Sequence, residues 1–122
     1  MTAAIAPDHP SLPARAITDD VYVAPQLGPA AMAEAARLGF RSVINNRPDF
    51  EGGPDQPTSA QVEAAALAAG LVYRHLPVRG NYQSPEEVAA CARLLAELPR
   101  PLLMFCRSGA RSTRLFVAAH TR

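Results

Sequence analysis

Residues 102–112 have the sequence LLMFCRSGARS, and this stretch decides the fold. Its first four residues are continuously apolar, which is typical of a strand that is buried on both faces of a sheet. Gly109 follows shortly afterwards, and a residue without a β carbon suits a tight turn. A helix is expected from about Ala110. A buried strand that passes through a tight turn into a helix indicates an α/β fold.

Strand and helix patterns alternate along the rest of the chain. Further strands are predicted at 21–23, 41–44 and 71–78, where β-branched and aromatic residues gather. Helices are predicted at 30–38, from Thr58 or Ser59 to 69, and from Ser84 to 98; Ser84, Pro85 and Glu87 form a clear capping box at the last of these. We therefore expect three layers: a mostly parallel sheet of four to five strands, flanked by helices.

The composition of the chain predicts one domain and gives no sign of a membrane or nucleic-acid partner. Residues 1–15 hold three prolines and few large apolar side chains, so they are expected to be a flexible lead-in to one domain at 16–122. The formal net charge of +1 gives little attraction to nucleic acid or acidic lipid. No segment has the roughly twenty apolar residues of a membrane span, and no signal peptide pattern is present.

Cysteine and histidine usage bears on location and cofactors. The two cysteines, Cys91 and Cys106, are too few and too far apart for a disulfide framework, which favours a reducing cytoplasm. No histidines stand at the spacing of metal ligands, so we expect neither a metal nor another cofactor. Cys91 falls on the apolar stripe of a predicted helix, where core packing is its expected role.

Residues 106–112 hold the candidate catalytic residues. A turn that opens a helix directs successive backbone N–H groups into one concavity, and the helix N-terminus adds partial positive charge. In such surroundings Cys106 is expected to be a thiolate nucleophile, and Arg111 offers a forked cation for an anionic substrate. The other candidates for the anion-binding loop are Arg107, Ser108, Gly109, Ala110 and Ser112.

Two enzyme families share this loop. Protein tyrosine and dual-specificity phosphatases carry Cys-x5-Arg-Ser/Thr, whereas rhodanese-type sulfurtransferases have a shorter loop that often reads Cys-Arg-x-Gly-x-Arg-Ser. The four residues between Cys106 and Arg111 resemble the rhodanese spacing. Residues 41–45, 75–78 and 102–112 instead resemble the strands and catalytic loop of a small dual-specificity phosphatase.

Both features occur together in the β-lactamase-hydrolase-like family. The chain resembles the phosphatase-like domain of that family in TDDVYVAPQL at 18–27, VINNRPD at 43–49, QPT at 56–58 and the Cys106 loop. The resemblance implies a phosphatase-like fold. It also implies a persulfide-handling metallo-β-lactamase-type domain as a partner, because members occur alone or fused to one.

The sequence leaves three functions open. Residues 79–83, where a phosphatase carries its acid, contain none, and sulfur transfer needs no proton for its leaving group. We therefore predict a sulfurtransferase that moves sulfane sulfur from thiosulfate or a persulfide through a persulfide on Cys106. One alternative is a phosphatase that hydrolyses a phosphoester through a phosphocysteine on Cys106. In that case Asp49 is one candidate for the acid, and an ordinary loop aspartate without a catalytic role is the competing interpretation. Arg47 and Asp49, both after the strand predicted at 41–44, are the weaker site candidates. The other alternative is a non-catalytic anion-binding or docking domain.

Overall fold

The computed structural model describes residues 12–121, and a five-stranded sheet forms its centre. The strands are β1 (Arg15–Ala16), β2 (Val21–Ala24), β3 (Ser42–Asn45), β4 (Val72–His75) and β5 (Leu102–Phe105), in the order β1-β2-β5-β3-β4. Only the short edge strand β1 is antiparallel to its neighbour. The predicted α/β fold with a mostly parallel sheet is confirmed.

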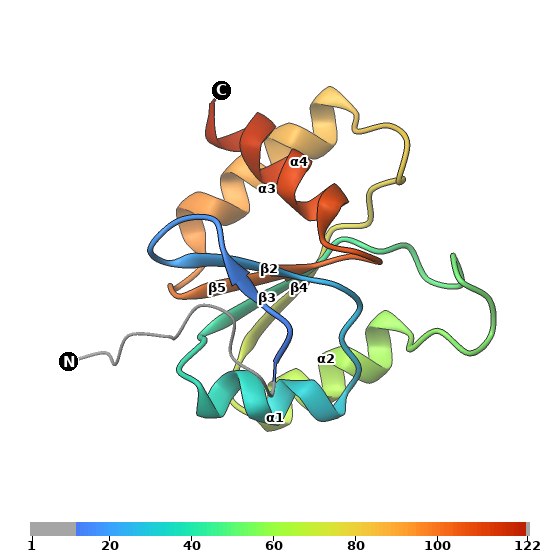
Figure 1. The fold of residues 1–122 in the computed structure, drawn as a ribbon, viewed down its shortest axis with the longest axis vertical. Coiled ribbons are helices and arrows are strands. Elements are labelled where there is room, and N and C mark those ends of the chain that lie inside the picture. The colour runs from blue at the N-terminus through green and yellow to red at the C-terminus, as the bar shows by residue number, and fades with distance from the viewer. Residues whose placement is uncertain (1–11, 122) are drawn as a thin grey trace.

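Helices cover both faces of the sheet (Figure 1). α1 (Ala30–Arg37) and α2 (Ser59–Ala68) lie on one face, and α3 (Pro85–Glu97) and α4 (Ala110–His120) lie on the other. Successive residues of β5 point to opposite faces. Leu103 and Phe105 therefore join the core beneath α1 and α2, while Leu102 and Met104 join the core beneath α3 and α4. This double burial explains why the strand is apolar throughout.

The packed part of the chain begins earlier than the sequence predicts. Leu12 and Ala14 are buried in the core beneath α1 and α2, and β1 pairs with β2. The boundary expected at residue 16 is therefore too late for residues 12–15. A two-residue strand is too short to show a periodic pattern, which is why the sequence did not reveal it. Residues 1–11 of the predicted lead-in lie outside the described residues.

The four parallel strands end at the same edge of the sheet, where an α/β fold binds its ligands. Four connections leave this edge: residues 25–29 after β2, residues 46–58 after β3, residues 76–84 after β4, and residues 106–109 after β5. They gather at one end of the molecule (Figure 1). Among residues 12–121, no helix is both long enough and apolar enough to cross a bilayer.

Candidate active site

The Cys106 side chain lies at the centre of a backbone turn. Cys106 follows β5 directly and is fully buried. Gly109 has a φ of 94° and donates its N–H to the Cys106 sulfur at 3.0 Å. A positive φ suits glycine because other residues are strained there. This turn directs the chain back over the sulfur immediately before α4 begins.

The surroundings of Cys106 favour the thiolate. Burial by itself raises the pKa of a thiol. Four hydrogen-bond donors around the sulfur outweigh this effect. They are the backbone N–H and the hydroxyl of Ser112 and the N–H groups of Gly109 and Ser108, and the pKa of Cys106 therefore lies below its ordinary value. Of these donors, the Gly109 N–H lies 3.0 Å from the sulfur.

Residues 106–112, which we call the Cys106 cup, are joined through the Ser112 hydroxyl to the residue that follows β3. The hydroxyl oxygen lies 2.8 Å from Asn46 Oδ1, and Asn46 Nδ2 donates to the carbonyl of Leu76 at 3.0 Å. A hydroxyl has a single proton; Ser112 donates it to Asn46 Oδ1, while its position beside Cys106 also lowers the pKa of that thiol. Asn46, a residue that the sequence did not single out, thereby fixes the position of this hydroxyl.

The Arg111 guanidinium is buried but only partly paired. Its residue is 8% exposed, Nη1 donates to the carbonyl of Val78 at 3.0 Å, and Nη2 donates to Glu51 Oε1 at 3.0 Å. Its Nε is buried and has no hydrogen-bond partner among residues 12–121. Buried polar groups in proteins are nearly always hydrogen-bonded. This N–H is therefore suited to an oxygen of an anionic ligand.

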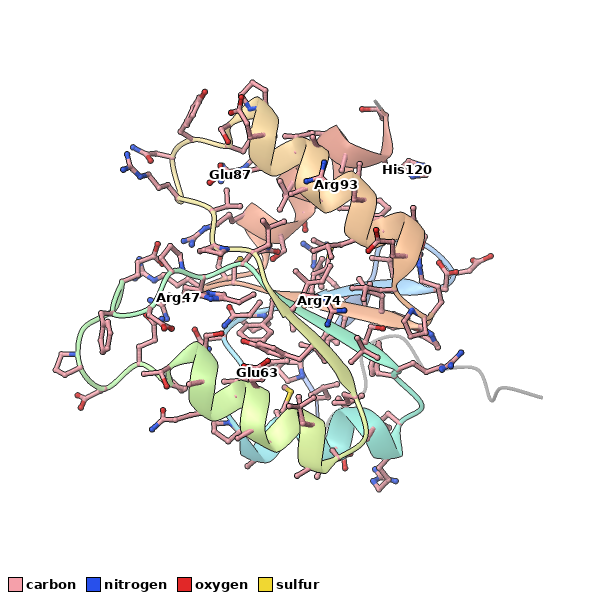
Figure 2. All side chains as sticks on the ribbon, turned by 180° about the vertical axis from the view of Figure 1, so that it is seen from behind. Arg47, Glu63, Arg74, Glu87, Arg93 and His120 are labelled. Carbon is pink, nitrogen blue, oxygen red and sulfur yellow. The ribbon has the colours of Figure 1, made fainter. Side chains whose placement is uncertain are left out.

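The connections after β3, β4 and β5, together with the start of α4, line one open pocket. Its volume is about 660 Å³, and its lining residues are Arg47, Glu51, Gly52, Gly80, Asn81, Arg107 and Arg111. Arg47 and Arg107 were candidates from the sequence, and the structure brings both together with Arg111. Arg47 lies at the end of the sheet where the loops gather (Figure 2). Ser108 and Ala110 are exposed, and the Ser108 hydroxyl accepts the Ala110 N–H at 3.3 Å.

Glu51 is the carboxylate of this pocket, and the sequence did not single it out. Its Oε1 accepts hydrogen bonds from Arg47 Nε at 2.9 Å and from Arg111 Nη2 at 3.0 Å. Partial burial raises the pKa of this carboxyl, but the two arginines lower it more, and the net shift is downward. The 47–57 loop contains Asp49 and Asp55 as well, so the sequence gave no reason to choose Glu51.

The loop around Glu51 has a defined internal structure. The Gln56 side chain is buried, accepts the Gly52 N–H at 2.7 Å and donates to the Pro48 carbonyl at 2.9 Å. A β carbon at Gly52 would lie 2.6 Å from Arg47 Nη2, so glycine permits this close approach. These contacts hold Glu51 against the two arginines.

Asp49, a weaker candidate for the acid from the sequence, contacts the start of a helix. Its Oδ1 accepts the backbone N–H of Ser59 at 2.7 Å, at the first residue of α2. A carboxylate stabilises a helix at this end because the first N–H groups lack partners within the helix. Asp49 does not line the pocket. The structure therefore places Glu51, not Asp49, beside Arg111.

Residues 13–121 match the family described as "Beta-lactamase hydrolase-like protein, phosphatase-like domain". The chain belongs to this family. It is similar to the β-lactamase hydrolase-like protein of Xylella fastidiosa, with 41% identity over 81 residues, which is 66% of this chain and 19% of the relative. The similar protein of Agrobacterium fabrum is 35% identical over 101 residues, which is 83% of this chain and 23% of the relative. This β-lactamase hydrolase-like chain thus spans about a fifth of these curated relatives.

Solved structures with the same fold include phosphatases. A candidate phosphatase from Neisseria meningitidis is 31% identical to this β-lactamase hydrolase-like chain, with a TM-score of 0.76; the match covers 83% of this chain and 71% of that one. The active form of Tk-PTP is 23% identical, with a TM-score of 0.66, and the match covers 90% and 74% of the two chains. Family and fold are thus phosphatase-like, as the sequence resemblance implied. They favour the phosphatase alternative over sulfur transfer.

Proposed function

We propose that this β-lactamase hydrolase-like domain is a phosphatase that hydrolyses phosphate monoesters through a phosphocysteine on Cys106. The observation that carries this proposal is the carboxylate of Glu51 in the pocket beside Arg111. The lack of an acid on residues 79–83 is one of two reasons to expect sulfur transfer, and the short loop is the other. Glu51 supplies an acid from a different loop, which removes the first of these reasons.

In the first step, the Cys106 thiolate attacks the phosphorus of the bound ester. The phosphoryl oxygens accept hydrogen bonds from the amides of residues 107–111 and from Arg111 Nε. The P–O bond to the leaving group breaks, and a protonated Glu51 gives its proton to the leaving oxygen. A bound phosphate dianion offsets the charge of Arg47 and Arg111, so binding of the substrate itself raises the pKa of Glu51.

In the second step, water attacks the phosphocysteine. Glu51, now a carboxylate, accepts a proton from this water, the S–P bond breaks, and the Cys106 thiolate and inorganic phosphate are released. The Ser112 hydroxyl stabilises the departing sulfur, because it already contributes to the low pKa of Cys106. Each residue thus returns to its starting state.

The first experiment measures hydrolysis of an activated aryl phosphate by the wild type and by Cys106→Ser. We expect turnover in the wild type and none in the variant, since serine in this cup is not ionised at neutral pH. A mass spectrum of the quenched reaction should show one added phosphoryl group on the Cys106 peptide. Absence of turnover in the wild type contradicts the proposal.

The second experiment tests the role of Glu51 by varying the leaving group. In Glu51→Gln, hydrolysis of an unactivated alkyl phosphate should fall by about 10²- to 10⁴-fold, because the proton donor is lost. Hydrolysis of an activated aryl phosphate should fall much less, because its leaving group needs little protonation. Asp55→Asn, on the same loop but outside the pocket, is the matched control. An equal loss with both substrates would mean that Glu51 only positions Arg111.

Sulfur transfer is the second candidate, and the short loop favours it. Four residues separate Cys106 from Arg111, the spacing of rhodanese-type enzymes. In this reaction the thiolate takes the sulfane sulfur of thiosulfate, sulfite leaves, and cyanide removes the sulfur as thiocyanate. A persulfide-handling metallo-β-lactamase-type domain would be the partner. Thiocyanate formation that is lost in Cys106→Ser, without phosphatase turnover, would favour this candidate.

A further inference from the structure

We propose that Arg79 and Arg114 form a second anion-binding subsite beside the catalytic pocket, and that it takes a second phosphoryl group of the substrate. This inference deepens the proposed function and rests on it. It narrows the substrate class to phosphate esters that carry another phosphoryl group close to the scissile one.

The subsite is a pocket of about 300 Å³ with a basic lining. Its lining residues are Arg79, Asn81, Tyr82, Gln83 and Arg114, which include two guanidinium groups, two amides and no carboxylate. One carboxylate, that of Glu87, lines an adjoining hollow together with Arg79. Its Oε1 already accepts the Ser84 N–H at 2.8 Å, as part of the capping box of α3. The lining therefore favours an anion.

A tight turn separates this subsite from the catalytic pocket. Arg79 and Tyr82 form an isolated bridge, with Gly80 and Asn81 between them, and Asn81 lines both pockets. A β carbon on Gly80 would lie 3.1 Å from Arg111 Nη2, so the turn packs directly against the catalytic arginine. One ligand can thus contact both sides of the turn.

Arg114 fixes the geometry of this turn. Its Nη2 donates to the Gly80 carbonyl at 2.7 Å. Arg111 and Arg114 lie three residues apart on α4, which puts their β carbons about 5–6 Å apart on the same side of the helix. The two guanidinium groups can therefore serve anionic groups that are neighbours in one small molecule.

The Arg79 residue is exposed, and although its backbone forms the bridge to Tyr82, its guanidinium makes no hydrogen bond or ion pair with the chain between residues 12 and 121. Its donors are available to a ligand. Around the two pockets, five arginines face one carboxylate: Arg47, Arg79, Arg107, Arg111 and Arg114 against Glu51. A single phosphate group engages Arg111 and the amide cup but leaves Arg79 and Arg114 unused. A second phosphoryl group provides the matching charge.

The test compares the binding of inorganic phosphate and inorganic diphosphate to Cys106→Ser by titration calorimetry. We expect diphosphate to bind at least about tenfold more tightly, the equivalent of one charge-assisted contact. Adding Arg79→Gln should reduce the ratio of the two affinities toward one, and Arg79→Lys should give an intermediate ratio. Arg93→Gln is the control for lost charge, because Arg93 lies on α3 away from the loops (Figure 2).

Each outcome decides between the alternatives. Equal affinity for the two anions, or an equal loss of the ratio in Arg79→Gln and Arg93→Gln, would overturn the subsite. A diphosphate preference that depends on Arg79 supports it, even if the wild type proves to be inactive on esters. Failure of the subsite with intact turnover of an aryl phosphate leaves the phosphatase proposal standing. The two proposals can therefore fail separately.

Discussion

The two cysteines show how the same side chain acquires opposite properties in one domain. Cys91 is buried on α3, and burial raises its pKa to about 12. Cys106 is also buried, but amide and hydroxyl donors lower its pKa. An alkylating reagent such as iodoacetamide should therefore modify Cys106 in the folded protein and leave Cys91 unmodified.

The Ser112 hydroxyl is expected to set part of this difference. In Ser112→Ala the Cys106 sulfur loses a donor, so the pKa of its thiol should rise. The pH midpoint of Cys106 alkylation, followed by peptide mass spectrometry, should move upward. Thr113→Val is the control. It also removes a hydroxyl from the first turns of α4, but the Thr113 hydroxyl donates to the Gly109 carbonyl at 2.8 Å and not to the sulfur. An unchanged midpoint in Ser112→Ala would show that the backbone amides alone hold the thiolate.

The raised pKa of Cys91 predicts a loss of stability in alkaline solution. Its thiol ionises near pH 9.0 in the unfolded chain but near pH 12 in the fold. The stabilisation is complete below pH 9 and is lost as the pH rises, by up to about 1.4 kcal/mol per pH unit. Urea unfolding at pH 7, 9 and 10 measures the effect. Cys91→Val should show a smaller decrease between pH 9 and 10, a window that lies below the pKa of 10.0 at which Tyr22 and Tyr73 ionise in the unfolded chain.

At the scale of the elements, the 47–57 loop has two separate tasks. Glu51 faces the arginines of the pocket, while Asp49 accepts the first N–H of α2. Asp49→Ala should lower the free energy of unfolding by about 1 kcal/mol, the usual effect of losing a helix cap. The ratio of the hydrolysis rates of the aryl and alkyl phosphates by Asp49→Ala should match that of the wild type. Urea denaturation and the two phosphate esters measure these effects; a selective loss with the alkyl ester would make Asp49 the acid instead.

The sequence predicted the elements far better than their contacts. The capping box at Ser84 and the apolar run at 102–105 predicted α3 and β5 closely, because both signals are local. The Cys106 cup was also predictable, since one unbroken stretch forms it. The position of Glu51 was not, because it depends on Gln56 and on arginines 4 and 60 residues away along the chain. Strand β1 was missed because its two residues are too few to form a pattern.

At the scale of the whole molecule, β5 joins the two cores. Its residues alternate between the layer beneath α1 and α2 and the layer beneath α3 and α4. Leu103→Ala should therefore cost about 2–5 kcal/mol, as large-to-small changes in a core do. Far-ultraviolet circular dichroism and Tyr fluorescence should report a single unfolding transition with the same midpoint. Two separate transitions would show that the layers unfold independently.

The Cys106 cup is one continuous segment, whereas the rest of the pocket comes from two other connections. Because these loops are separate from the Cys106 cup, they can be replaced one at a time. Swapping residues 47–57 or 79–83 for the equivalent loops of a relative would retune the choice of leaving group or of substrate without disturbing the nucleophile. In such grafts the Cys106 cup is kept unchanged, and only the two loops proposed to set the specificity are exchanged.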